Sequence, residues 1–167
     1  MAVLSIRTLP DSVLREKAKK VTLFNESLQT LVEDMIDTMR YANGVGLAGN
    51  QVGVLLRVVV IEIPEEEEVR VLINPEIIKV EGERTVDEGC LSIPGYRGEL
   101  TRSVKVRVKA LDREGKALRI RAEGLLAQAL EHEIDHINGI LYIDHLSSHE
   151  HLWKLERDEV ATTTETI

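Results

Sequence analysis

The most constraining feature of this sequence is the pentapeptide HEIDH at residues 132–136, which lies within a predicted helix over residues 124–137. Residues four apart lie one turn apart on the same face of a helix, so His132 and His136 can reach one metal ion. Glu133 is placed to take a proton from a water at that ion without being a ligand itself. Two histidines can also fall at this spacing by chance, so the motif alone leaves a purely structural helix open.

A catalytic site of this kind requires three protein ligands and an open fourth position. In the longer pattern HExxHxxGxxH a third histidine would stand where this chain has Tyr142. A downstream glutamate, Glu150, is available, but it lies only 14 residues beyond His136 and is expected on the surface of another helix. The single cysteine, Cys90, is the remaining candidate, although a lone cysteine is often a buried, inert side chain. One cysteine excludes an intramolecular disulfide and fits a reducing compartment.

A glycine-rich segment, GVGLAGNQ at residues 44–51, is the third notable feature. It follows a predicted helix and lacks the Lys-Ser/Thr pair of a phosphate-binding loop, which argues against nucleotide binding. Its glycines suit a backbone that approaches a ligand closely, and Gln51 offers an amide donor.

Length and charge narrow the class of protein. A chain of 167 residues fits one domain with a real core, and the net charge of −8 argues against binding nucleic acid or an anionic membrane through a basic field. No stretch approaches the ~20 apolar residues that span a bilayer, and the N-terminus lacks a secretory apolar region. We therefore expect a cytoplasmic protein.

Periodicity predicts an α+β fold. Apolar residues at helical spacing predict a helix from Asn25 to about Ala42, with Asn25 as its N-cap. The other predicted elements are strands at 55–63, 69–73 and 77–80, a hairpin at 104–108 and 118–122 with Val104, Val106 and Val108 buried, and helices at 124–137 and 147–160.

Taken together, three motifs in this order resemble peptide deformylase: GVGLAGNQ, EGCLS at residues 88–92, and HEIDH. The resemblance covers essentially the whole chain. It implies one catalytic domain over residues 1–167, with mixed, mainly antiparallel β-sheets around a central metal-binding helix and helices near both termini. Two residues depart from the family pattern: Gly49 replaces an alanine, which could loosen the Gln51 loop, and Glu131 replaces a glutamine, which adds a carboxylate near the site.

The resemblance implies a metal-dependent hydrolase that removes the N-formyl group from the first methionine of nascent polypeptides and releases formate. Cys90, His132 and His136 would bind one divalent ion, most often Fe²⁺ in this family, although Zn²⁺, Ni²⁺ or Co²⁺ also suit such ligands. Glu133 would act as general base, and the Gln51 amide and Leu91 N–H would stabilise the oxyanion.

The resemblance also predicts the substrate contacts. Val45, Gly46, Leu125 and Ala129 would line the methionine pocket, Gly46 and Gly89 would pair with the peptide backbone, and Arg97 would lie further out. Gln128 is expected at the rim of this pocket, with its side chain pointing to water. Arg102 could form an ion pair with Glu88.

Partners and rival activities complete the expectations. Nascent formyl-methionyl chains are the expected partners, with a transient ribosome contact, although the segment 150–167 is not basic enough to favour docking on RNA. His145, His149 and His151 are expected to be surface residues rather than a second metal site. An HExxH endopeptidase and a deformylase-like protein without catalysis are the alternatives.

Overall fold

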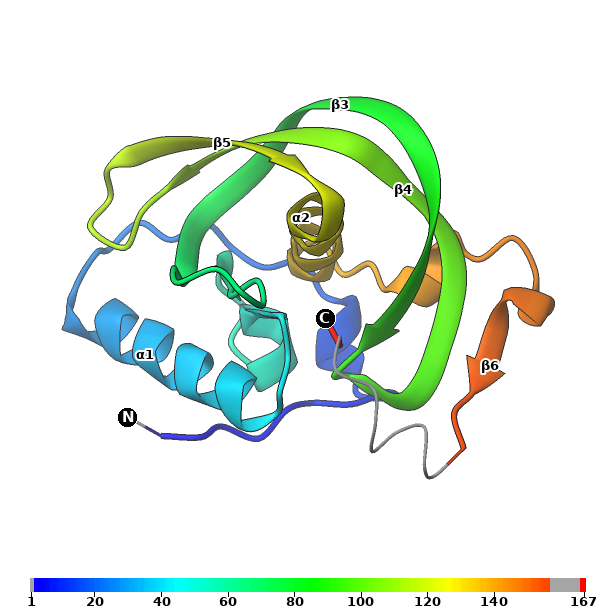
Figure 1. Ribbon diagram of the computed structural model, residues 1–167. Coiled ribbons are helices and arrows are strands. Elements are labelled where there is room, and N and C mark those ends of the chain that lie inside the picture. The colour runs from blue at the N-terminus through cyan, green and yellow to red at the C-terminus, as the bar shows by residue number, and fades with distance from the viewer. Residues whose placement is uncertain (1, 157–165) are drawn as a thin grey trace.

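The computed structural model describes residues 2–156 and 166–167, and the fold of this part of the chain is α+β, as predicted (Figure 1). Its two α-helices and six strands are α1 (Glu26–Tyr41), β1 (Gly46–Ala48), β2 (Val58–Ile61), β3 (Arg70–Cys90), β4 (Ile93–Leu111), β5 (Ala117–Glu123), α2 (Gly124–Ile137) and β6 (Leu152–Lys154).

Helix α1 forms where the apolar periodicity predicts it. The Asn25 side chain accepts a hydrogen bond from the Leu28 N–H at 3.0 Å and so satisfies a donor that the first helical turn leaves free. One face of the helix, including Val32, Met35 and Met39, is buried against β1 and β2. The prediction of this helix, its cap and its end is confirmed within a residue.

The strands form one antiparallel sheet in the order β1-β2-β3-β4-β5, with β6 paired to β4. The predicted strands at 69–73 and 77–80 are parts of the single strand β3, which passes the intervening Asn74-Pro75 with a positive φ at Asn74 and a shift of register. Strands β3 and β4 join through a tight turn, because Cys90 pairs with Ile93. This turn ends β3 directly at the cysteine.

The predicted hairpin is confirmed as β4 and β5, with one error. Val106 and Val108 are buried opposite Ala122 and Ile120. Val104 is exposed, because β5 ends opposite Lys105 and nothing from β5 covers the residue before it.

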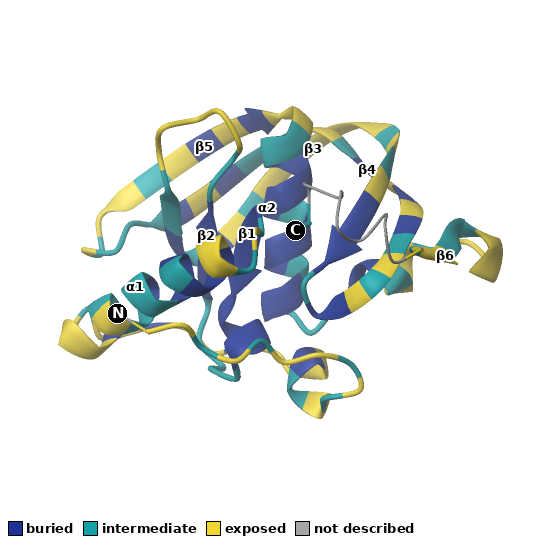
Figure 2. Ribbon diagram, turned by 60° about the horizontal axis from the view of Figure 1, so that its bottom comes forward, coloured by how far each residue is buried: buried dark blue, intermediate teal, exposed yellow. Residues whose placement is uncertain are grey.

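Helix α2 lies beneath the curved sheet, with β3, β4 and β5 arching over it (Figure 1). Most of its residues are buried, as the dark ribbon in Figure 2 shows. Its apolar side packs in one core cluster with β2, β4 and β5, whereas α1 packs in a second cluster on the other side of β2. The helix therefore carries its polar residues into the interior, where they must find partners.

The expected C-terminal helix over residues 147–160 is wrong for the part that can be compared. His149–His151 form a single 3₁₀ turn and Leu152–Lys154 form β6, while residues 157–160 lie outside the described part. The segment offers few apolar residues for a buried helical face, and the edge of β4 supplies backbone partners at Tyr96–Gly98 instead. Among the described residues, no helix is long and apolar enough to cross a membrane.

Candidate metal centre

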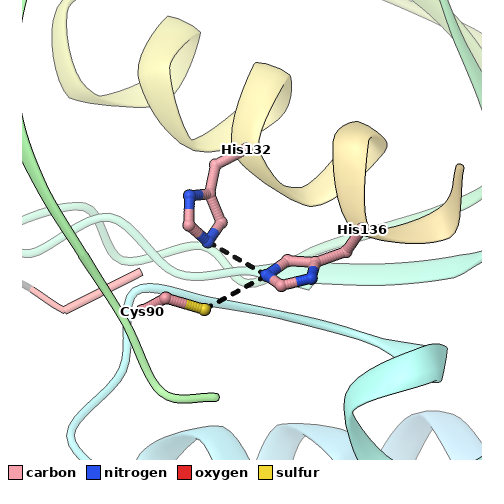
Figure 3. Close-up of side chains that lie close together, drawn as sticks. All are labelled: Cys90, His132 and His136. Carbon is pink, nitrogen blue, oxygen red and sulfur yellow. Dashed lines mark hydrogen bonds between the residues drawn. The ribbon is translucent and has the colours of Figure 1, made fainter. Parts of the chain in front are cut away.

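Cys90, His132 and His136 come together although Cys90 is 46 residues from His136 in the chain (Figure 3). The Nε2 atoms of the two histidines lie 3.1 Å apart, and the Cys90 Sγ lies 3.3 Å from the His136 Nε2. All three ligand atoms lie within 4.8 Å of one another, and all three residues are buried. Bonds of about 2.0–2.3 Å to one tetrahedral ion would place such atoms about 3.3–3.8 Å apart, so the donor set fits a metal ion.

Glu88 and Arg102 fix the orientation of the His132 ring. Its Nδ1 lies 2.6 Å from the Glu88 Oε2, and Glu88 accepts two further bonds from the Arg102 guanidinium at 2.7 and 3.0 Å. A neutral His132 that donates its Nδ1 hydrogen to Glu88 would direct its Nε2 lone pair toward Cys90 and His136. The predicted Glu88–Arg102 ion pair is therefore confirmed, and Glu88 also contacts His132, one of the three candidate ligands.

The electrostatics of this pair favour charge in the interior. Burial alone would raise the pKa of Glu88, but His132 and Arg102 outweigh it and hold the pKa well below its usual value. Burial alone would likewise lower the pKa of His132, but Glu88, Glu133 and Cys90 outweigh it and hold the pKa well above its usual value. Burial and the nearby His132 charge lower the pKa of His136.

Gln128 belongs to this support and not to a pocket rim. Its side chain is buried, and its Nε2 donates to the Glu88 Oε1 and to the Asp87 carbonyl, each at 3.2 Å. The expectation that it points to water is wrong, because a buried carboxylate has lone pairs that the interior must satisfy.

Glu133 differs from Glu88, because its carboxylate accepts no hydrogen bond from the described residues. Its side chain is fully buried, and among the described residues neither of its oxygens has a hydrogen-bond partner. Burial raises its pKa to about 7, the opposing effect of His132 being smaller. A carboxylate of this kind can exchange a proton with a substrate near neutral pH.

The turn after Cys90 gathers several polar groups. The Ser92 N–H lies 3.4 Å from the Cys90 Sγ, and the Gln51 Nε2 donates to the Ser92 Oγ at 3.1 Å and reaches the same sulfur at 3.7 Å. The Gln51 Oε1 accepts the Ala48 N–H, which fixes the side chain. Ser92 was not singled out from the sequence, although its place in the EGCLS motif was a usable signal.

Several of the residues expected to bind substrate lie near residues of this centre. Gly46 is the first residue of β1 and Val45 directly precedes that strand, and a Cβ at Gly46 would stand 2.6 Å from the Glu133 Oε2. Ala129, with Leu125 packed at the margin, shares an apolar cluster with Val45.

Gly89 and Arg97, two further residues expected to bind substrate, lie in contact with each other. A Cβ at Gly89 would meet the Arg97 guanidinium at 3.1 Å, and Arg97 donates to the Asp87 Oδ1 at 2.6 Å. Gly89 is buried, whereas Arg97 is partly exposed. Arg97 therefore covers the backbone of the strand that ends at Cys90.

Both departures from the family pattern have local explanations. A Cβ at Gly49 would stand 2.6 Å from the Val54 and Leu56 carbonyl oxygens, so the glycine permits a close approach between backbones. Glu131 accepts hydrogen bonds from the Ser103 N–H at 2.7 Å and the Ser103 Oγ at 3.0 Å, which ties α2 to β4.

The other histidines are not part of the cluster of three candidate ligands. His149 and His151 stand in a 3₁₀ turn without buried residues, and His145 contacts Asp135 at 2.8 Å. Asp135 also accepts a bond from Arg102 at 2.8 Å, so an ionic chain that the sequence did not reveal runs from the centre to the surface. Among the described residues, the metal-ligand cluster is the one formed by Cys90, His132 and His136.

Comparison with known proteins gives a consistent result. The family model described as "Polypeptide deformylase" matches residues 3–151. A peptide deformylase of Dehalococcoides mccartyi is 58% identical over 159 residues, which are 95% of this chain and 95% of that protein.

Solved structures agree. The crystal structure of a peptide deformylase from Legionella pneumophila superposes with a TM-score of 0.85 at 54% identity, covering 87% of each chain. A peptide deformylase from Ehrlichia chaffeensis in complex with actinonin has a TM-score of 0.86 at 40% identity, covering 90% of this chain and 92% of that one.

Proposed function

Because the chain belongs to the polypeptide deformylase family, whose metal-dependent members remove the N-formyl group from nascent polypeptides, we propose specific roles for its residues in that reaction. Cys90, His132 and His136 hold the metal ion, and Glu133 is the general base. The observation that carries this assignment is the meeting of three buried ligand atoms beside a buried carboxylate without hydrogen-bond partners among the described residues.

The proposed ion is Fe²⁺. Two imidazoles and one thiolate suit several borderline ions, so the proposal of iron rests on the resemblance to the family. When bound, the ion would supply Lewis-acid chemistry, lowering the pKa of a water and polarising the formyl oxygen. Both Fe²⁺ and its thiolate ligand are oxidisable, so activity should be lost in air.

Glu133 moves the proton. With its pKa raised to about 7 by burial, its carboxylate is present in substantial amount at neutral pH and can take a proton from the attacking water. The same group then delivers that proton to the amine that leaves as the formyl C–N bond breaks. Formate and a peptide with a free N-terminus are the products.

Two donors would stabilise the negative oxygen that forms during attack: the Gln51 amide and the Leu91 N–H. The Gln51 Nε2 already lies beside the Cys90 Sγ at 3.7 Å, so it needs little movement to reach an oxygen near the ligands. Loss of one such donor typically lowers the rate about 10²- to 10³-fold.

The substrate would bind as an added strand. Val45, Gly46 and Gly89 present backbone groups beside the ligands, and Leu125 and Ala129 supply apolar surface for the methionine side chain. Arg97, which lies over Gly89, would contact the peptide further from the reacting bond.

We propose that residues 1–167 act as one catalytic domain in the cytoplasm, because its substrates are newly made polypeptides. A transient ribosome contact would bring the enzyme to these chains. Direct nucleic-acid binding is not part of the proposal, since the net charge is −8.

The test is formate release from formyl-methionyl peptides under anaerobic conditions, with metal analysis of the same preparation. His136→Ala should lose both the bound metal and formate release, and the matched control His149→Ala should keep both. Full metal content in His136→Ala would contradict the ligand assignment. Cleavage of internal peptide bonds without formate would contradict the reaction.

A further inference from the structure

Residues Thr166 and Ile167 lie across the metal centre and pair with its backbone. The Val45 N–H donates to the Thr166 carbonyl at 2.8 Å. The Ile167 N–H donates to the Gly89 carbonyl at 3.4 Å, and the Leu91 N–H donates to an Ile167 oxygen at 3.2 Å. Thr166 also forms a parallel bridge with Gly44, so this dipeptide is held from both sides as a short strand.

These bonds engage the same groups that the substrate would need. Under the proposed function, Val45 and Gly89 pair with the peptide backbone, and the Leu91 N–H stabilises the oxyanion. A backbone N–H makes one good hydrogen bond, so the Leu91 donor cannot serve Ile167 and a developing oxyanion together.

The side chain of Ile167 reinforces the overlap. It is only 2% exposed and belongs to the apolar cluster that includes Val45 and Ala129, with Leu125 packed against it. These are the residues proposed to receive the methionine side chain.

Several surface cavities lie away from the metal centre. Five cavities of about 400–490 Å³ are lined by other parts of the molecule, and none of these five includes Cys90, Glu133 or Val45 in its walls. Figure 1 places the C-terminal end of the chain beside the end of β3, next to α2.

We propose that Thr166 and Ile167 form an internal competitor that occupies the peptide-binding groove and must leave before a formylated peptide can bind. The proposal rests on the proposed function for its effect on activity, but docking of the dipeptide can be measured without any turnover. It makes the enzyme self-limiting at low substrate concentration and fully active when substrate is abundant.

The expected kinetic signature is a change in KM. If the dipeptide is docked in about 90% of molecules, only about one tenth are competent to bind, and the apparent KM rises about tenfold. The value of kcat is unchanged, because saturating substrate displaces the dipeptide. Deletion of residues 166–167 should therefore lower KM up to about tenfold and leave kcat as it is.

Three variants and one peptide test this. The deletion and Ile167→Asp, which places a charge in the apolar cluster, should both lower KM, while the matched control Val80→Asp on the exposed face of β3 should not. An N-acetylated synthetic peptide with the sequence of residues 162–167 should inhibit the deletion variant competitively against the formylated peptide.

Hydrogen exchange provides the readout that is independent of activity. The Val45 and Leu91 amides should exchange faster in the deletion variant than in the full chain, while the amides of Val59 and Val60 in β2 remain protected and show that the fold is intact. Unchanged KM together with unchanged protection of Val45 and Leu91 would overturn the proposal. Faster exchange in a protein that releases no formate in any form would contradict the proposed function and leave the docking standing.

Discussion

Substitution of Gly46 by alanine tests how tightly the carboxylate of Glu133, the proposed general base, is held in place. An alanine Cβ at this position would lie 2.6 Å from the Glu133 Oε2 and 2.9 Å from its Cδ and Cγ, whereas ordinary contacts begin at 3.4 Å. The carboxylate must therefore move by about 0.8 Å, and it is fully buried, so its surroundings resist the movement. Misplacement of a catalytic group by about 1 Å can lower the rate about 10²-fold, which corresponds to about 2.7 kcal/mol of transition-state stabilisation.

The assay is formate release with metal content and thermal melting measured on the same samples. Gly46→Ala should keep its metal and lose about 10²-fold in kcat/KM, with the loss largely in kcat. The control is Gly124→Ala at the start of α2, the helix that carries Glu133. A Cβ there meets nothing within 4 Å, and the positive φ of +59° adds only backbone strain of about 1–2 kcal/mol. If Gly46→Ala retains activity within about twofold of the parent, the Glu133 carboxylate can make room for a Cβ at position 46 without loss of rate, and the inference that it is tightly held is refuted.

Three further substitutions address the proposed base, the carboxylate that contacts His132, and a surface ion pair. Glu133→Gln should retain the metal while formate release falls about 10²- to 10⁴-fold, and normal turnover in metal-loaded protein would refute the base assignment. Glu88→Gln should weaken metal binding about 10- to 100-fold, measured by chelator competition on the folded protein, and unchanged affinity would exclude a supporting role. Burial raises the pKa of Asp144, but hydrogen bonds from Arg15 and the Leu141 N–H outweigh it and lower the pKa, so its stabilising contribution at neutral pH is lost below about pH 4. Asp144→Asn should accordingly show a shallower fall in melting temperature between pH 6 and pH 3 than the parent, and parallel curves would contradict this.

Local patterns predicted much of the fold. The period of α1 and its Asn25 cap, the alternation in β4 and β5, and the extent of α2 all depend on near neighbours in the chain, and all are present. The union of two short predicted segments into β3 was missed, because it depends on pairing with β4 and not on the Asn74-Pro75 interruption. The same reason explains β6, which forms on the free edge of β4.

In the candidate site, too, local motifs identified some residues, and the contacts made by the others depend on the tertiary fold. The sequence indicated Cys90, His132 and His136 and also a Glu88–Arg102 ion pair, but the contact between Glu88 and His132 is visible only in the tertiary structure. Gln128 is polar on a helix near the pocket, and its burial against Glu88 has no local signature. The docking of residues 166–167 depends wholly on partners distant in the sequence.

The tight turn between β3 and β4 has a consequence for the order of folding. A hairpin closes from its turn in about 1–10 μs, so the Cys90 end of β3 can form early, while the histidines lie more than 40 residues further along the chain and arrive only when α2 docks. High affinity for the metal ion is therefore expected only after α2 has docked and the chain is fully folded. Metal should slow unfolding and leave the rate of refolding nearly unchanged, so the supply of metal in the cell would set how long each folded molecule lasts.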